Sequence, residues 1–253
     1  MMSSPPKELS PGEQFQKEKL RNIHKMQADP ELKKKALDWI VHSGKYRYSY
    51  HFSWLGRPII QFPQDIIAIQ ELIWRIKPDF VVETGIAHGG SIILSASILE
   101  LIGGNGRVIG IDIDIREHNR IEIEKHPMAR RITMIQGSSV SEETARKVHA
   151  LVKGKGTALV ILDSNHTHDH VLRELQIYSP LVNKNSYCVV FDTVIENMPD
   201  GSFSDRPWGK NNNPKTAVET FLKTTDRFEV DTDLEAQLLI TVAPGGYLKC
   251  IKD

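Results

Sequence analysis

The feature that most constrains this chain is an alternation of short apolar runs with segments of helical periodicity. Four isoleucines recur at helical spacing between Pro63 and Pro78, so a helix is expected to open the pattern. Apolar runs of strand length then follow at 80–82, 107–111, 132–135, 158–162 and 187–191. Helical segments lie between them, as at 90–101 and 171–182. Strands that alternate with helices favour a parallel sheet.

The carboxyl-terminal part of the sequence breaks this alternation. A helix is predicted over 215–222, and strands are then predicted over 228–230, 238–242 and 247–251, with a turn at 244–246. A strand-dense end after repeated strand–helix units indicates an antiparallel edge. We therefore predict an α/β, Rossmann-like fold, with a mostly parallel sheet, an antiparallel C-terminal edge strand and helices on both faces.

The length of the chain, 253 residues, suits one sizeable core better than two. We assign residues 61–253 to the Rossmann-like domain and residues 1–60 to an N-terminal extension. Within the extension, residues 1–12 are expected to be a mobile tail and residues 13–39 to form one or two peripheral helices. The aromatic- and turn-rich segment 46–61 either covers the mouth of a site or packs on the sheet, and we favour packing.

The charge of the chain argues against an extended anionic partner. Its 32 basic and 32 acidic residues cancel without long blocks, so a small molecule is a better expected partner than nucleic acid or a membrane surface. We expect no signal peptide and no membrane span, because polar residues interrupt every apolar stretch. Cys188 and Cys250 lie in apolar runs and are expected to be buried thiols, which fits a reducing, cytoplasmic location.

The first predicted strand leads into a glycine-rich segment, ETGIAHGGS at 83–91. Its glycines let the backbone turn tightly and approach a ligand. The spacing differs from the G-x-G-x-x-G of dinucleotide-binding loops, and the acid at Glu83 would repel a pyrophosphate. The same acid would accept the methionyl ammonium of S-adenosylmethionine, with Gly85, Ala87 and Ser91 lining this cofactor. A purely structural strand-to-helix turn is the alternative.

Two further strand ends complete the expected cofactor site. Asp112 and Asp114 share one side of the second strand, and Asp112 is favoured because it follows the apolar run directly. A carboxylate at this place can accept both hydroxyls of a ribose. Ser138, in the turn after the third strand, would line the adenine. A turn with capping serines explains that segment equally well.

The reacting end is predicted where the fourth and fifth strands end. Asp163 and Asp192 follow these strands, at the edge where an open α/β sheet binds its ligand. Asp163 is also assigned to catalysis and to the cofactor site. The two aspartates can share an oxygen-preferring cation such as Mg²⁺, which would lower the pKa of an acceptor hydroxyl and orient it. His166, three positions after Asp163, is our preferred catalytic base for that hydroxyl.

The neighbouring histidines allow other interpretations. His168 and His170 are expected to form the solvated first turn of the next helix, with Thr167 as its cap, and this is also the alternative for His166. A non-haem iron site is a rival interpretation of the cluster, because such a site needs two histidines and a carboxylate on one face. Nothing else in the sequence supports oxygen chemistry, and the acidic loop would then have no role.

Together these motifs resemble the cephalosporin hydroxylase and rhamnosyl O-methyltransferase family, whose members are similar to metal-dependent class I methyltransferases. The resemblance rests, in chain order, on WLG at 54–56, QFPQD at 61–65, the loop 83–91, GID at 110–112, LDSNH at 162–166, DT at 192–193 and PGGYL at 244–248. It implies a class I methyltransferase fold. It also implies cofactor roles for Glu83, Gly85, Ser91 and Asp112.

The resemblance further implies a metal site at Asp163 and Asp192. A more distant likeness to catechol-type methyltransferases, which place a base three residues after the first metal aspartate, supports His166. Many relatives have an acid immediately before the second aspartate, where this chain has Phe191. A metal would then depend on the two aspartates and on the hydroxyl of Thr193 or water.

The implied activity is O-methylation with S-adenosylmethionine and Mg²⁺ or another divalent cation. The implied acceptors are hydroxyls of sugars or natural products, in polysaccharide or secondary-metabolite biosynthesis, and members tend to be homo-oligomers. The segment 195–213 has the length and polarity of a loop that covers a substrate. Trp208 would stack on a sugar face and Asn212 would bind its hydroxyls, and an exposed turn is the alternative.

Two other function classes stay open at this stage. An NAD-dependent oxidoreductase would share the fold, but the loop spacing and Glu83 disfavour it. A non-catalytic protein that binds the cofactor is suggested only by Phe191.

Overall fold

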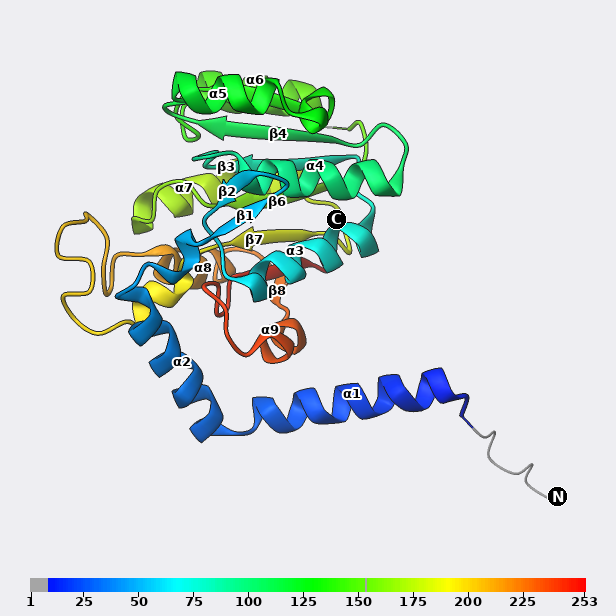
Figure 1. Cartoon of the computed structure of the whole chain (residues 1–253), viewed down its shortest axis with the longest axis vertical. Helices are drawn as coiled ribbons and strands as arrows, with labels where there is room; N and C mark the ends of the chain where they lie inside the picture. Colours follow the sequence, from blue (N-terminus) through cyan, green and yellow to red (C-terminus); the bar gives the residue numbers. More distant parts are fainter. Residues whose placement is uncertain (1–8, 153) are drawn as a thin grey trace.

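A seven-stranded sheet forms the centre of the computed structural model, which describes residues 9–152 and 154–253. The strand order is β5-β4-β3-β6-β7-β9-β8 (Figure 1). The strands are β3 (Phe80–Thr84), β4 (Arg107–Asp112), β5 (Ile132–Gln136), β6 (Ala158–Leu162), β7 (Tyr187–Val190), β8 (Phe228–Val230) and β9 (Tyr247–Cys250). The five neighbours β5, β4, β3, β6 and β7 pair in parallel. Strand β9 is antiparallel to both β7 and β8. The predicted fold class is confirmed, and the antiparallel strand lies just inside the sheet edge that β8 completes.

Helices cover both faces of this sheet. One layer contains α3 (Pro63–Ile76), α4 (Gly90–Ile102), α5 (Glu117–Glu124) and α9 (Thr232–Leu238), and the other contains α6 (Glu142–Val152), α7 (His168–Tyr178) and α8 (Pro214–Leu222). Successive residues of a strand face opposite layers, so Val81 packs in the first core and Val82 in the second. Burial on both faces explains why the central strands are continuous apolar runs.

Short 3₁₀ helices connect several elements. They are η1 (Tyr48–Tyr50), η2 (Pro127–Arg131), η3 (Ser179–Leu181) and η4 (Thr193–Asn197). The segment 171–182, predicted as one helix, is therefore the end of α7 followed by η3. Pro180 lies inside η3, and its missing N–H explains why the α-helix does not continue.

The N-terminal extension contains the two peripheral helices that were predicted, α1 (Pro11–Gln27) and α2 (Pro30–Gly44). Ser10 and Glu13 form a capping box, which starts α1 at Pro11. The predicted tail, residues 1–12, therefore extends too far, because Pro11 and Gly12 belong to α1. Residues 1–8 of that tail lie outside the described residues. Figure 1 shows α1 along the lower side of the molecule, where it contacts α9. The boundary at residue 61 stays a prediction.

Segment 46–61 packs against the domain through a β-hairpin, β1 (Phe52–Trp54) and β2 (Arg57–Ile59). The indole of Trp54 donates a hydrogen bond of 3.0 Å to the hydroxyl of Ser97 on α4. A Cβ atom on Gly90 would lie 2.3 Å from the carbonyl oxygen of Pro58, so the first turn of α4 touches the hairpin directly. The segment packs as we favoured, although its partner is α4 rather than the sheet.

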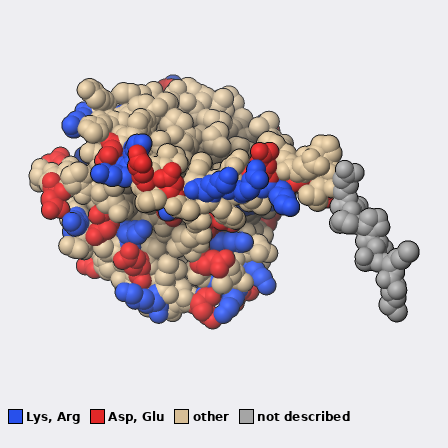
Figure 2. All heavy atoms as spheres, turned by 90° about the horizontal axis from the view of Figure 1, so that it is seen from below, with Lys and Arg blue, Asp and Glu red and all other residues tan. Residues whose placement is uncertain are grey.

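Acidic and basic side chains are interspersed on the face shown in Figure 2. This distribution agrees with the cancelling charges of the sequence. Within residues 9–152 and 154–253, no helix combines the length and the apolar character needed to cross a membrane.

The strand predicted at 238–242 is wrong. Residues 232–238 form helix α9, and the β-branched residues that follow it form a loop. The backbone N–H of Val242 donates to Asp65 Oδ2 at 3.0 Å, and the hydroxyls of Thr241 and Tyr247 donate to Asp65 Oδ1. The apolar run therefore satisfies its polar groups with a buried carboxylate instead of a neighbouring strand.

Asp65 joins the first turn of α3 to this C-terminal loop and is completely buried. Burial raises the pKa of Asp65 to about 6, although the hydrogen bonds from Thr241, Val242 and Tyr247 oppose that rise. The folded protein thus holds a proton on Asp65 at a pH where the unfolded chain has lost it. This contribution to stability is complete below the unfolded pKa and disappears as the pH rises through about 6.

We predict that Asp65→Asn becomes more stable relative to wild type as the pH rises from 4 to 7. The relative gain should be about 1.4 kcal/mol per pH unit between the two pKa values and about 2 kcal/mol in total, because the amide does not ionise. Urea unfolding of both proteins across this pH range measures the difference. A difference that stays constant with pH would contradict the assignment.

Candidate active site

The predicted site residues gather at the carboxyl-terminal edge of the parallel strands. Glu83 lies near the end of β3, Asp112 ends β4, and Asp163 and Asp192 follow β6 and β7. Because β3 and β6 pair in register from Phe80↔Ala158 to Thr84↔Leu162, the ends of these two strands lie side by side. The sheet thus brings carboxylates from four separate segments to one edge.

Asp163, His166 and Asp192 form one cluster. Each offers a ligand atom, and these atoms all lie within 4.8 Å of one another. His166 Nε2 is 3.2 Å from Asp192 Oδ2, and the ring of Trp208 meets the His166 ring edge-on at 4.8 Å between centroids. The tertiary structure therefore assembles three of the predicted catalytic and metal residues.

The electrostatics of this cluster suit a cation. Burial, and secondly the charge of Asp192, raise the pKa of Asp163 well above its usual range. Two carboxylates and an imidazole nitrogen within a few ångströms are ligands that divalent ions accept. An ion at this place would offset the repulsion between the two aspartates.

The side chain beside the two aspartates is that of His166. Thr193 is completely buried, and its hydroxyl donates to the carbonyl oxygen of Pro244 at 3.0 Å, so this hydroxyl makes a contact in the core. Phe191 is also buried and packs against Tyr247 with 6.4 Å between ring centroids. An aromatic ring at position 191 therefore belongs to the core on this side of the sheet, beside the cluster.

The buried carboxylate of Glu83 lies next to this cluster in the strand order. Ser91 donates a hydrogen bond to Glu83 Oε1, whereas Glu83 Oε2 is buried and has no hydrogen-bond partner in the described part of the chain. Burial raises the pKa of Glu83 to about 7, which the hydrogen bond from Ser91 opposes. A cationic group at Oε2 would supply the missing hydrogen bond and offset the cost of burying the charge.

Asp112 holds the loop that follows β3. Its Oδ2 accepts hydrogen bonds from the backbone N–H groups of Ile86 at 2.8 Å and Ala87 at 3.2 Å. Its Oδ1 accepts one from the backbone N–H of Asp114 at 3.0 Å. The side chain of Asp114 is exposed and pairs with Arg116. The choice of Asp112 over Asp114 therefore agrees with its contact to the cofactor loop, and Asp112 keeps an exposed portion.

Gly85 serves a contact between strands. Its φ is +91°, and a Cβ atom there would lie 2.1 Å from the carbonyl oxygen of Asp163. The expected reason for this glycine was the approach of a ligand, but its nearest neighbour is the backbone that carries Asp163. Ala87 also has a positive φ, +46°, and is exposed beside it.

Sequence reasoning missed the residues that support this loop from outside. The guanidinium of Arg57 donates to the carbonyl oxygen of His88 at 2.8 and 3.0 Å and to Asn119 Oδ1 at 2.9 Å. Asn119 Nδ2 in turn donates to the carbonyl oxygen of Ala87 at 3.0 Å. Gln61 was missed as well, and its Nε2 donates to Asp163 Oδ2 at 3.1 Å. Only Gln61 lies in a motif that the sequence had singled out.

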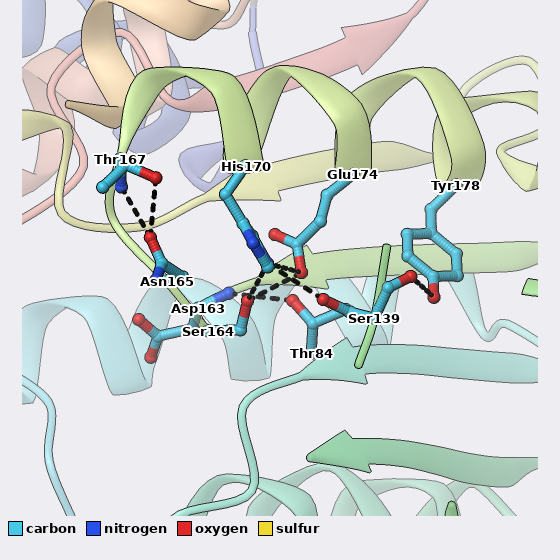
Figure 3. A network of polar contacts seen from close by, with 9 residues as sticks. All are labelled: Thr84, Ser139, Asp163, Ser164, Asn165, Thr167, His170, Glu174 and Tyr178. Carbon is cyan, nitrogen blue, oxygen red and sulfur yellow. Dashed lines mark hydrogen bonds and ion pairs between the residues drawn. The ribbon is translucent and has the colours of Figure 1, made fainter. Parts of the chain in front are cut away.

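The segment predicted to line the adenine meets α7 in a polar network (Figure 3). His170 Nε2 lies 3.1 Å from Ser139 Oγ and 3.2 Å from Ser164 Oγ, and Ser164 donates to the buried Glu174 at 2.7 Å. Ser138 lies beside Ser139 and is half-buried. In Figure 3 the carboxylate of Asp163 points away from His170, Ser139 and Glu174.

His168 contacts a residue outside the cluster of Asp163, His166 and Asp192. It begins α7, as predicted, and its Nδ1 lies 2.8 Å from the hydroxyl of Thr216. The iron interpretation requires two histidines in the cluster, yet His168 and His170 both contact other groups.

The predicted substrate residues fall into two groups. Trp208 lies against His166, where a ring can cover the site. Asn212 instead caps α7, because its Oδ1 accepts the backbone N–H of His168 at 2.9 Å and its Nδ2 donates to Pro207 at 2.9 Å. Thr167, the predicted cap, makes no side-chain cap bond and donates to Asn165 instead.

This sheet, with one antiparallel strand and acids at the strand ends, defines an α/β methyltransferase. The chain matches the family described as Rhamnosyl O-methyltransferase/CmcI over residues 46–251. The rhamnosyl O-methyltransferase of Mycobacterium bovis is 29% identical over 189 residues, which cover 73% of this chain and 72% of the relative.

Solved structures agree on the fold. An apo structure of CmcI superposes with a TM-score of 0.60 at 20% identity, over 81% of this chain and 78% of that chain. A CmcI structure with Mg and SAM gives a TM-score of 0.55 at 18% identity, over 80% and 77%. The chain belongs to the rhamnosyl O-methyltransferase/CmcI family and is an S-adenosylmethionine-dependent O-methyltransferase. The family assignment argues against the oxidoreductase alternative.

Because Gly85 approaches Asp163 so closely, we predict that Gly85→Ala destabilises the protein by about 2–4 kcal/mol, from the positive φ and from the displaced backbone of Asp163. Gly56→Ala is the matched control, since Gly56 has a φ of +86° and open space around it. That variant should lose only about 1 kcal/mol. Equal losses in chemical unfolding would show that the contact with Asp163 contributes nothing.

Proposed function

We propose that the chain transfers a methyl group from S-adenosylmethionine to a hydroxyl of a sugar or natural-product acceptor with the help of a divalent metal. The observation that carries this proposal is the cluster of Asp163, His166 and Asp192 on the strand edge that also holds the buried Glu83. The cluster suits a metal and a base, and Glu83 suits the donor.

The donor end is supported by Glu83 and Asp112. The unpartnered Oε2 of Glu83 would accept the methionyl ammonium, and the exposed portion of Asp112 would accept the ribose hydroxyls. Gly85, Ala87 and Ser91 shape the loop between them, and Ser138 lies where the third predicted strand ends. We assign the adenine to that side.

The metal end is supported by the donor set of Asp163 and Asp192, with His166 beside them. Mg²⁺, which accompanies SAM in one CmcI structure, supplies Lewis-acid stabilisation of an acceptor oxygen when it is bound. Gln61 donates a hydrogen bond to one oxygen of Asp163. Phe191 does not remove a ligand from this set, so we do not favour a non-catalytic protein.

His166 is proposed as the catalytic base. The reaction requires one proton to leave the acceptor hydroxyl as its oxygen bonds to the methyl carbon, while the carbon–sulfur bond breaks and S-adenosylhomocysteine is released. The imidazole of His166 lies beside the two aspartates and is partly exposed, so in its neutral form it can accept that proton through the ring nitrogen that carries no hydrogen. Contact with Asp192 orients the imidazole, and Trp208 limits its rotation.

The acceptor class is taken from the family and from the mouth of the site. The matched relative is named for rhamnosyl O-methylation, and Trp208 offers an aromatic face of the kind that sugars contact. The satisfied amide of Asn212 makes it a weaker candidate for binding the acceptor than Trp208. Interspersed surface charges support a small or glycosyl acceptor over nucleic acid.

We also propose that the protein works in the cytoplasm as a homo-oligomer. The buried free thiols of Cys188 and Cys250 suit a reducing compartment. The exposed Phe15 and Leu20 on α1 support contacts between copies of the chain.

We predict that donor affinity strengthens as the pH rises from 5.5 to 7, because the ammonium requires ionised Glu83 and the pKa of Glu83 is about 7 in the donor-free protein. The dissociation constant should fall about tenfold per pH unit well below pH 7. Calorimetric titration with S-adenosylmethionine measures this change, with NAD as the control ligand. Glu83→Gln should bind more weakly and without this pH dependence, and binding of NAD alone would overturn the proposed function.

We predict that His166→Gln lowers kcat/KM by about 10²–10³-fold, because the acceptor proton loses its base. Release of S-adenosylhomocysteine with rhamnosyl acceptors measures the rate. His168→Gln is the matched control and should stay near wild type, since His168 lies outside the cluster. Equal activity of His166→Gln and wild type would remove the base from this residue.

A further inference from the structure

Gln61 connects the metal cluster to the interior beside Glu83. It lies between β2 and α3 and is only 7% exposed. Its Nε2 donates to Asp163 Oδ2 at 3.1 Å, which is the amide orientation that an ionised, metal-binding Asp163 requires, because the reverse orientation would place two acceptors against each other. The amide oxygen Oε1 therefore points elsewhere, and it is buried with no hydrogen-bond partner among the residues that the structure describes.

Three residues with such oxygens line one small cavity. Gln61, Glu83 and Ser95 all border a cavity of about 10 Å³, room for the centre of one water-sized group. Gln61 Oε1, Glu83 Oε2 and Ser95 Oγ are all buried, and each lacks a partner within residues 9–152 and 154–253. Three residues with unsatisfied buried oxygens around one cavity indicate that a hydrogen-bonding group belongs there.

The charges around the cavity indicate which group that is. Two carboxylates, Glu83 and Asp65, border it, and its lining within the described chain includes no lysine, arginine or histidine. A water molecule has the right size but leaves the negative charge uncompensated. A primary ammonium has three N–H donors for the three oxygens and carries the opposite charge.

We propose that Gln61 is a positioning residue that joins the two halves of the reaction: its Oε1 completes the site for the methionyl ammonium of the donor, and its Nε2 orients the metal ligand Asp163. This inference rests on the proposed function, which places the ammonium at Glu83 and the metal at Asp163. Ser95 becomes the third partner of the ammonium.

A bridge of this kind couples the two binding events. An ammonium that holds the amide oxygen fixes the rotation of the amide, and the amide nitrogen then fixes one oxygen of Asp163. The donor has then already ordered Gln61 and Asp163, so metal binding does not incur that entropy cost again. Linkage makes the effect reciprocal, so the metal strengthens donor binding by the same factor.

The experiment is calorimetric titration of the full-length protein with S-adenosylhomocysteine, with and without saturating Mg²⁺. In wild type, Mg²⁺ should strengthen binding by about fivefold or more, the range of ordinary coupling energies. Gln61→Met keeps the length and burial of the side chain but removes both polar contacts, and its ratio should fall to about one.

Gln64→Met is the matched control. Gln64 lies three residues away and also has a buried Oε1 without a partner in the described chain, but it does not line the cavity. It should keep the wild-type ratio. A wild-type ratio in Gln61→Met, or a wild-type ratio near one, overturns the inference about Gln61. Failure of wild type to bind S-adenosylhomocysteine at all would instead overturn the proposed function.

A second probe distinguishes the ammonium from a trapped water. 5′-Methylthioadenosine has the adenosine and the sulfur but no amino acid group. Gln61→Met should weaken S-adenosylhomocysteine without Mg²⁺ by about tenfold, the effect of one charge-assisted hydrogen bond, and leave 5′-methylthioadenosine unchanged. Equal effects on both ligands would show that the cavity holds water and that Gln61 does not contact the ammonium.

Discussion

The parallel pairing of β3 with β6 fixes the arrangement of the rest of the site. The two strands pair in parallel and in register, and the backbone leaves β3 at Gly85, where a side chain would collide with the carbonyl oxygen of Asp163. This contact sets Glu83 and Asp163 on neighbouring strands at one edge. The carboxylates that we propose for the donor and for the metal are therefore placed by the same backbone geometry.

Buried acidic side chains lie near this strand pair. Their charge must be stabilised by neutral hydrogen-bond donors or by ligands. Asp65 has three hydrogen-bond donors of its own, and Glu174 receives one from Ser164. Glu83 and Glu174 each keep one buried oxygen without a partner in the described chain, and burial raises the pKa of Glu83 and of Asp163. A cationic ligand at Glu83 and Asp163 would offset the cost of burying their charge.

Much of the fold and part of the site could be predicted from local sequence patterns. The strand ends placed Glu83, Asp112, Asp163 and Asp192 at one edge, because parallel strands share a direction. The run 238–242 failed, since its β-branched residues satisfy their backbone with the carboxylate of Asp65, far earlier in the chain. Asn212 was interpreted as a sugar ligand because its role as the cap of α7 is a contact across 44 residues.

Local sequence patterns were enough to predict the class of fold, the acidic loop after β3 and the strand-end positions of Asp163 and Asp192, because strand and helix periodicity and the polar residues that end each strand are local properties. The contacts that support these residues became visible only in three dimensions. His166 lies beside the two aspartates, Arg57 and Asn119 hold the loop after β3, and Gln61 reaches Asp163 across 102 residues of sequence. The physical reason is that hydrogen bonds between distant segments depend on side-chain packing in three dimensions, which no periodicity in one segment encodes.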